Sequence, residues 1–282
     1  MSDIHTRNKS ALAPLRAAMV DFDAEAVRAA LRAVIAPDAV IHMPYPLGDL
    51  TGPDALYDAC YAPLLAALPD LERRDWIVMG GPDEHGADWV GCGGHYCGTF
   101  VAPWLDIPPT GHLAHMRYHE FYRMVDGKVV EIQALWDIPE VMLQADAWPM
   151  APSLGREFCI PGPMTLDGIV QGPRDAARSE AAKQHIIAML DHLTKHPSQG
   201  GPEVMEMERF WHPRMNWYGP AGIGTARGIA GFRNWHQIPF LNAMPDRGQH
   251  DDELTYHFFG DGDYAAVTGW PDMIQTVTHA GW

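Results

Sequence analysis

The chain has 282 residues, a formal net charge of −16 and a pI near 5.2. So acidic a chain is repelled by polyanions, and we therefore expect neither nucleic acid nor an anionic membrane surface as a partner. No run of about 20 apolar residues is present, and the first residues lack the apolar core of a signal peptide. The four cysteines show neither a CxxC pair nor a disulfide framework, which predicts reduced thiols and a cytoplasmic location.

In chain order, the first half predicts helices followed by long strands. Asp23 is a plausible N-cap for the second helix, and Pro37 follows the end of that helix. The expected helices are 11–20, 24–36 and 53–67, the expected strands are 39–45, 73–80, 87–100, 113–124 and 128–137, and a short amphipathic helix covers 138–145.

The last two of these strands form the clearest local pattern. They flank Val125-Asp126-Gly127, which is a hairpin turn signal. The second strand alternates between an apolar and a polar set, with Val130, Ile132, Ala134 and Trp136 on one face and Glu131, Gln133 and Asp137 on the other. We therefore expect a half-buried antiparallel pair.

The second half begins after a proline-rich stretch. Residues 147–174 contain five prolines and show no periodicity, which is typical of a connector between domains. Further helices are expected over 177–196 and 202–211.

One segment of the chain nearly repeats another. Residues 37–70 align without a gap on residues 213–246 at a constant offset of 176, with nine identical pairs that are mostly Pro and Gly. Pro and Gly fix backbone shape, so the repeat predicts two copies of one fold. Nothing in the second copy corresponds to residues 105–146. We therefore expect a first domain at 1–146, a connector at 147–174 and a second domain at 175–282 that lacks its last strands, with further chain or a partner subunit covering the open edge.

Helices followed by antiparallel strands indicate an α+β fold with helices on one face of a curved sheet. The strings GPDALYDACYAPLLAALPDL and FYRMVDGKVVEIQALWD resemble the SnoaL-like polyketide cyclase family of the nuclear transport factor 2-like superfamily, over about 25–146 and in part over 203–282. The resemblance implies two tandem cone-shaped α+β barrels. In each, helices pack on a strongly curved, mainly antiparallel sheet and enclose one apolar cavity.

The resemblance also implies an activity. Family members with known activity use no cofactor and close a polyketide ring by intramolecular aldol condensation, with an Asp as general acid/base. The matching residue here is Asp137, six positions after Glu131. We expect a cyclase, lyase or isomerase acting on a small hydrophobic carbonyl compound, because burial can raise a carboxyl pKa toward neutrality. The alternative is that Asp137 caps the following helix or faces solvent.

Two histidines are the expected catalytic partners of Asp137. His115 and His119 lie four residues apart on the strand that pairs with the Asp137 strand, and a neutral imidazole there could donate a hydrogen bond to a developing enolate. A polar solvent face or a dimer face is the alternative. We expect no metal ion at His112, His115 and His119, because no acidic residue completes a ligand set at standard spacing.

Five further residues are candidates for substrate binding, with packing as their alternative role. Gln133 is notable because the family often has Trp at this position. The five are His95, Trp104, Tyr118, Gln133 and Trp136.

A different class of function remains open at this point. The superfamily also provides non-catalytic small-molecule-binding or dimerisation modules, since a fold does not determine function. Dehydration or epoxide opening is a third possibility that keeps the cavity. For assembly we expect a homodimer or an intramolecular pairing of the two domains.

Overall fold

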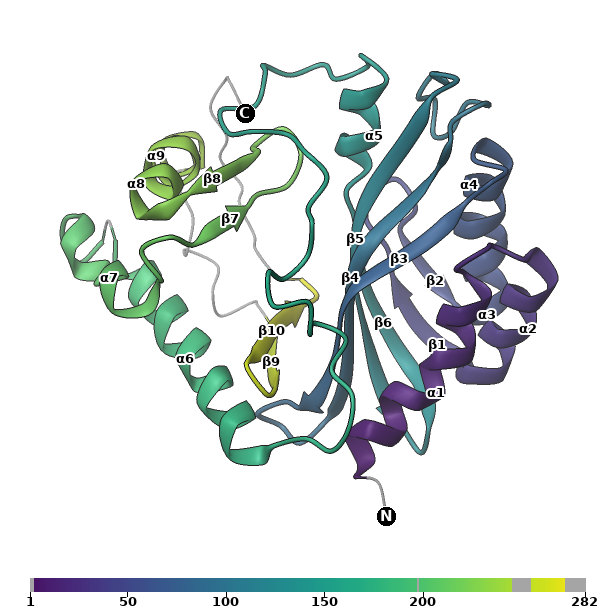
Figure 1. Ribbon diagram of the computed structural model, residues 1–282, viewed down its shortest axis with the longest axis horizontal. Coiled ribbons are helices and arrows are strands. Elements are labelled where there is room, and N and C mark those ends of the chain that lie inside the picture. The colour runs from purple at the N-terminus through teal and green to yellow at the C-terminus, as the bar shows by residue number, and fades with distance from the viewer. Residues whose placement is uncertain (1–2, 197, 245–254, 272–282) are drawn as a thin grey trace.

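The computed structural model describes residues 3–196, 198–244 and 255–271, and Figure 1 labels their elements. The helical elements of the first half are α1 (Ile4–Ala18), α2 (Ala24–Val34), α3 (Gly52–Leu56), η1 (Tyr57–Tyr61), α4 (Ala62–Ala67) and α5 (Ile138–Gln144). Its strands are β1 (Ile35–His42), β2 (Asp49–Thr51), β3 (Glu72–Pro82), β4 (Asp88–Thr99), β5 (Leu113–Val125) and β6 (Lys128–Trp136).

The second half is built from shorter pieces. Its elements are α6 (Ala176–Thr194), η2 (Pro202–Met205), α7 (Met207–Phe210), β7 (Asn216–Tyr218), β8 (Thr225–Arg227), α8 (Gly228–Phe232), η3 (Arg233–Gln237), α9 (Ile238–Ala243), β9 (Tyr256–Asp261) and β10 (Tyr264–Gly269).

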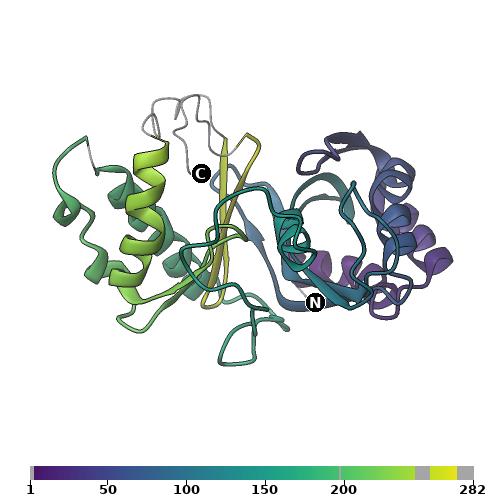
Figure 2. The same ribbon diagram turned by 90° about the horizontal axis from the view of Figure 1, so that it is seen from above.

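A curved mixed sheet organises the first half. Its strand order is β2-β1-β6-β5-β4-β3, and only the β1–β6 pair is parallel. Helices α1 to α4 cover one face of this sheet, and the second half lies on the opposite side (Figures 1 and 2). The α+β architecture implied by the resemblance is therefore present in the first half. We call the face toward α1–α4 the inner face and the opposite face the outer face.

Local sequence signals explain most element boundaries. Asp126 and Gly127 both have positive φ, of 49° and 76°, which a two-residue hairpin between right-twisted strands requires. Helix α1 begins at Ile4 rather than near residue 11, because the Asp3 side chain accepts a hydrogen bond from the Thr6 backbone N–H at 2.7 Å.

The first strand also differs from its expected range. It starts at Ile35 and ends at His42, whereas the sequence predicted 39–45. Ile35 pairs with Val129 of β6, and the register then shifts before pairing resumes at Val40. A tertiary contact with a strand about 90 residues later thus ends helix α2 two residues early.

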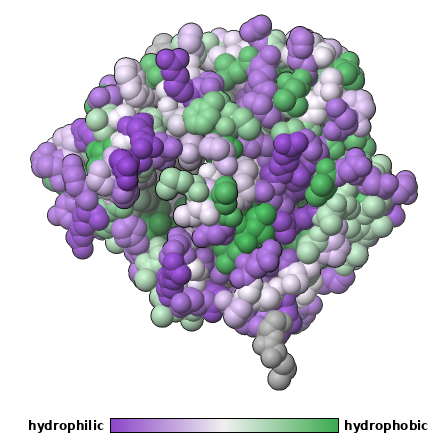
Figure 3. Space-filling view, in the orientation of Figure 1, coloured by the Kyte–Doolittle hydropathy of each residue, from purple (hydrophilic) through white to green (hydrophobic). Residues whose placement is uncertain are grey.

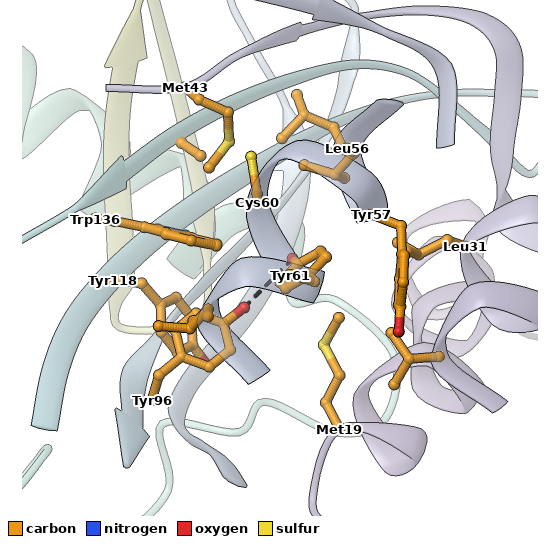
Figure 4. Close-up of a cluster of buried hydrophobic side chains, with 14 of the residues drawn as sticks. Met19, Leu31, Met43, Leu56, Tyr57, Cys60, Tyr61, Tyr96, Tyr118 and Trp136 are labelled. Carbon is orange, nitrogen blue, oxygen red and sulfur yellow. Dashed lines mark hydrogen bonds between the residues drawn. The ribbon is translucent and has the colours of Figure 1, made fainter. Parts of the chain in front are cut away.

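The alternation of β5 and β6 builds the core on the inner face. Leu31 and Trp136 are 1 % exposed and belong to the main core cluster, together with residues of α1 to α4 (Figure 4). Burying one such side chain contributes about 1.5–3 kcal/mol.

The second half does not support a second tandem barrel. Its described strands form two separate two-stranded sheets, β7-β8 and β10-β9. Among the described residues no strand follows Gly269, and none corresponds to β5 and β6. Residues 197, 245–254 and 272–282, which belong to the expected second domain, lie outside the described residues.

A local part of the repeat is nevertheless visible. The run β8–α8–η3–α9 occurs at a constant offset of 176 from β2–α3–η1–α4, including the short π-helical turn in each. The shared Pro and Gly pattern therefore sets a local backbone course without setting the whole fold.

Several contacts join the second half to the first. Lys9 Nζ on α1 lies 2.5 Å from Asp261 Oδ2 on β9, and both side chains are less than one-tenth exposed. Phe259 packs with Met79 and Trp89 in a small apolar cluster. Hydrophilic and hydrophobic residues are interspersed over the face shown in Figure 3. Across the described ranges, none of the helices has the length and apolarity to cross a membrane.

Candidate functional site

The two faces of the sheet separate the residues that the sequence had grouped together. On β5, Tyr118 belongs to the inner-face core, whereas Phe121 packs against Phe259 of the second half. The alternation of the strand therefore places His115, Arg117 and His119 on the outer face.

The inner face carries a buried polar network centred on Glu120. Glu120 accepts hydrogen bonds from Arg73 Nη1 at 2.6 Å and from Tyr122 OH at 2.5 Å. Its other oxygen accepts from Tyr96 OH and Trp136 Nε1, both at 2.9 Å. Arg73 and Glu120 are at most 3 % exposed, so their ion pair is buried within the network.

Three expected substrate-binding residues belong to this interior. Tyr118, Trp136 and Trp104 are at most 2 % exposed and lie in the main core cluster. Tyr96 and Tyr61 are hydrogen-bonded to each other there, and Tyr61, Tyr96, Tyr118 and Trp136 surround one another in Figure 4. In this structure these side chains pack against one another, which is the alternative role that the sequence left open.

Asp137 lies on the outer face, at the junction with the second half. It is 7 % exposed and occupies the N-cap position of α5, yet its side chain makes no capping hydrogen bond. Its Oδ2 instead accepts from Arg117 Nη2 at 3.1 Å and from the Ala221 backbone N–H at 2.9 Å. The Asp137 side chain therefore neither caps α5 nor faces solvent.

Arg117 extends this junction. Its guanidinium also donates to the backbone carbonyl oxygens of Tyr218 at 3.2 Å and Gly219 at 2.7 Å. The Arg117–Asp137 ion pair thus holds residues 218–221 of the second half against β5 and β6. We call this set of contacts the junction clamp.

Burial controls the acidity of Asp137. It raises the pKa of the carboxyl above its ordinary value, against the lowering effects of the Ala221 N–H and Arg117. Among the described carboxyl groups whose pKa is shifted, Asp137 alone is shifted upward. A buried carboxyl with a raised pKa is the kind of group that can take up and return a proton.

His115 and His95 form a second outer-face group. His115 Nδ1 lies 3.1 Å from Glu140 Oε1, and its ring lies edge-on to that of His95 with 5.7 Å between centroids. His95 Nδ1 accepts a hydrogen bond from Trp76 Nε1 at 3.1 Å. Burial lowers the pKa of His95 to about 4, so this imidazole is neutral at physiological pH.

The remaining two expected site residues, His119 and Gln133, line an outer-face pocket of about 610 Å³. Gln133 Oε1 accepts a hydrogen bond from Thr268 Oγ1 at 2.7 Å, which joins β6 to β10. Burial lowers the pKa of His119 to about 4. The pocket is mostly apolar, and its other lining residues are Phe121, Ala134, Leu135, Val267, Thr268, Gly269, Trp270 and Pro271.

Asp137 neighbours this pocket along the strand. Leu135 lines the pocket, and Asp137 lies two residues later, directly after the end of β6, a spacing of about 7 Å along an extended chain. His119 on β5 lies opposite Leu135 on β6, and the next pair of residues on this face is Arg117 and Asp137. The clamp and the pocket therefore occupy adjoining rows of the outer face.

Sequence reasoning missed four residues of these sites. Two of them could have been found from the sequence. Arg117 lies between the two selected histidines, and Glu120 is an acidic residue at a position where the alternation of the strand predicts an apolar one. Thr268 and Cys159 had no sequence signal, because their roles depend on contacts between segments more than 60 residues apart.

A known family is similar to the first half of the chain. The model of the SnoaL-like polyketide cyclase family matches residues 14–145. This part of the chain has the SnoaL/NTF2-like α+β fold. No curated protein matches the chain.

Several solved structures are similar to about half of the chain. A protein provisionally called a SnoaL-like polyketide cyclase from Jannaschia sp. CCS1 is 23% identical, covers 53% of this chain and 97% of its own, and has a TM-score of 0.44. IdmH from Streptomyces antibioticus, provisionally called a polyketide cyclase, is 25% identical, covers 49% and 98%, and has a TM-score of 0.41. AclR from Streptomyces galilaeus, provisionally called a hydroxylase, is 21% identical, covers 51% and 84%, and has a TM-score of 0.41.

Proposed function

We propose that this chain is a SnoaL-like acid/base enzyme that acts without a cofactor on a hydrophobic carbonyl compound, with Asp137 as the acid/base. The observation that carries the proposal is the raised pKa of a carboxyl that is buried beside a mostly apolar pocket. The match of residues 14–145 to the SnoaL-like polyketide cyclase family supports the reaction class.

In the proposed reaction, Asp137 removes a proton from a carbon next to a carbonyl group and later returns it. The Arg117 guanidinium keeps Asp137 ionised before the step and neutralises negative charge during it. His119 is neutral, and its imidazole N–H donates a hydrogen bond to the enolate oxygen. When the substrate binds, its acidic C–H replaces the Ala221 N–H as the neighbour of Asp137 Oδ2.

Proton exchange tests this chemistry without the natural substrate. The chain is incubated in D₂O with 2-tetralone or phenylacetone, which are hydrophobic ketones, and NMR follows the loss of the α C–H signal. We expect wild type to accelerate the exchange and Asp137→Asn to lose that acceleration. Asp126→Asn is the matched control, because Asp126 is exposed in the β5–β6 turn.

Two results would contradict the proposal. Equal acceleration by wild type and Asp137→Asn would remove Asp137 from the reaction. No acceleration of either ketone by wild type would argue against carbon-acid chemistry on this class of compound.

The second candidate function is a non-catalytic binding module. It is favoured by the junction clamp, in which Arg117 and Asp137 bind backbone groups of residues 218–221. On this proposal Asp137→Asn lowers the melting temperature and leaves the affinity of the outer-face pocket for an apolar ligand unchanged. Thermal melting together with 2-tetralone titration distinguishes the two functions.

A further inference from the structure

Three metal-binding side chains from three separate segments meet on the outer face. They are His95 of β4, His115 of β5 and Cys159 of the connector, and their donor atoms all lie within 4.8 Å of one another. Cys159 Sγ is 3.8 Å from His95 Nε2. No sequence pattern groups these three residues, because Cys159 is 44 residues from the nearer histidine.

These distances are close to those of a zinc site. Zn–N bonds of about 2.0–2.1 Å and Zn–S bonds of about 2.3 Å place tetrahedral donor atoms about 3.3–3.6 Å apart. The donor atoms of this cluster therefore need to move inward by about 1 Å or less. Cys159 is exposed on the connector, so the connector can bring its thiolate closer, while the two histidines, which lie on neighbouring strands, can adjust only by rotating their side chains.

Glu140 orients one of the ligands. Its Oε1 lies 3.1 Å from His115 Nδ1, and its Oε2 accepts a hydrogen bond from the Arg117 backbone N–H at 2.6 Å. Glu140 Oε1 and His115 Nδ1 are within ion-pair distance without hydrogen-bond geometry, so His115 Nδ1 is a buried nitrogen with no hydrogen-bond partner beside a carboxylate. A carboxylate that accepts the proton of one ring nitrogen leaves the other nitrogen free for a metal ion, which is the usual arrangement behind metal-binding histidines. The anchored Glu140 is therefore a positioning residue for His115.

Trp76 reports on the other histidine. Its indole N–H donates to His95 Nδ1, so Nε2 carries the proton in the metal-free imidazole. A metal ion at Nδ1 replaces the Trp76 hydrogen bond. A metal ion at Nε2 shifts the proton to Nδ1, where it opposes the indole N–H. In both cases metal binding breaks the Trp76–His95 hydrogen bond.

We propose that His95, His115 and Cys159 bind Zn²⁺, with one coordination position open to water. The ligand set of two imidazoles and one thiolate matches the preference of this ion. On binding, the Cys159 thiol releases its proton to solvent and the thiolate bonds to the metal. The ion then fastens the connector to the outer face of the sheet. This site is separate from the Asp137 clamp, so it does not depend on the proposed acid/base activity.

Cobalt substitution tests the site directly. The full chain, free of affinity tag and stripped of metal, is titrated with Co²⁺ and followed by absorption spectroscopy. We expect one equivalent to produce a near-ultraviolet thiolate-to-Co²⁺ charge-transfer band, and Zn²⁺ to displace it. Cys159→Ser should abolish the band, and Cys159 is exposed, so this variant should fold. A band that survives in Cys159→Ser, or the absence of any one-equivalent complex, overturns the proposal.

Two further variants test the positioning residue and a nearby control histidine. Glu140→Gln should weaken Zn²⁺ binding about 10- to 100-fold while retaining the charge-transfer band. His112→Ala is the matched control, because His112 is exposed three residues before His115 and should leave affinity unchanged. An equal loss of affinity in His112→Ala would indicate scattered surface binding and would contradict the proposal.

Thermal stability gives an independent readout. Since a ligand that binds only the folded state stabilises it, Zn²⁺ should raise the melting temperature of wild type. The rise should be absent in Cys159→Ser. In Trp76→Phe, Zn²⁺ affinity should be retained or higher, because the competing indole hydrogen bond is gone. A Zn²⁺-dependent rise of equal size in Cys159→Ser would count against the site.

Discussion

The Arg117 guanidinium and the Asp137 carboxylate form a 3.1 Å ion pair in which both side chains are less than one-tenth exposed. The pair joins neighbouring strands of the first half and also binds the backbone of residues 218–221. One buried pair therefore connects the candidate acid/base to the packing of the second half.

Removing the cation of this pair should be strongly destabilising. Arg117→Met leaves the Asp137 carboxylate buried without its counter-ion, and we expect a loss of about 3–5 kcal/mol in the free energy of unfolding at pH 7. Urea unfolding measures this change. Arg123→Met is the control. Arg123 is on β5, as Arg117 is, and pairs with Glu131 of β6, but its side chain is one-third exposed, so its replacement should cost about 1 kcal/mol or less. A loss at Arg117 as small as the control would show that the clamp contributes little.

Replacing Glu120 in the inner-face network should also lower the free energy of unfolding. Glu120→Gln removes one of the two carboxylates that pair with Arg73. It also weakens the hydrogen bonds from Tyr96, Tyr122 and Trp136. We expect a loss of about 1–3 kcal/mol, because buried hydrogen bonds are weakened while Arg73 keeps its 2.9 Å ion pair with Asp75. Glu25→Gln on the exposed first turn of α2 should change stability by less than about 0.5 kcal/mol. Guanidinium denaturation compares the two, and similar values for both would refute the assignment.

His119 should titrate near pH 4, which NMR of its imidazole measures. Its folded-state pKa lies below its ordinary value of 6.5, so the unfolded chain binds the proton first as pH falls. The contribution of His119 to stability is therefore complete above about pH 6.5 and declines toward pH 4. His119→Gln should show a flatter stability profile across this range. Parallel profiles for the two proteins would contradict the lowered pKa.

The Gln133–Thr268 hydrogen bond should hold β10 against β6. Both side chains are at most 7 % exposed, and Thr268→Val keeps the shape while leaving the Gln133 oxygen unsatisfied. We expect a loss of about 1–3 kcal/mol, measured by urea unfolding. Thr255→Val, at an exposed position just before β9, is the matched control and should stay near wild type. If the two substitutions have equal effects, the hydrogen bond does not secure the second half.

Short-range signals predicted the elements of the first half well. The expected strands 113–124 and 128–137 correspond to β5 and β6 within one residue, because period-2 alternation and a turn with two left-handed residues are encoded locally. The expected helix 202–211 is instead split into η2 and α7 by Glu206 with a φ of 45°. No residue type in that stretch signals a left-handed conformation.

The candidate site was predicted only as a set of residues. Period-2 alternation correctly put Gln133 and Asp137 opposite Trp136, since adjacent side chains of a strand point to opposite faces. Tyr118, Trp104 and Trp136 pack in the core, and their expected role in substrate binding stays a prediction.

By itself, the sequence determined the α+β course of the first half, the local backbone repeat at an offset of 176, and the presence of a carboxyl at position 137. These features follow from alternation, turns, Pro and Gly, which act over a few residues. The tertiary structure decided that the second half forms two small sheets, that Asp137 pairs with Arg117, and that Cys159 approaches His95. These outcomes depend on contacts between segments that are far apart in the sequence. Such contacts bury the Asp137 carboxyl, which raises its pKa, and bring Cys159 close to His95 and His115.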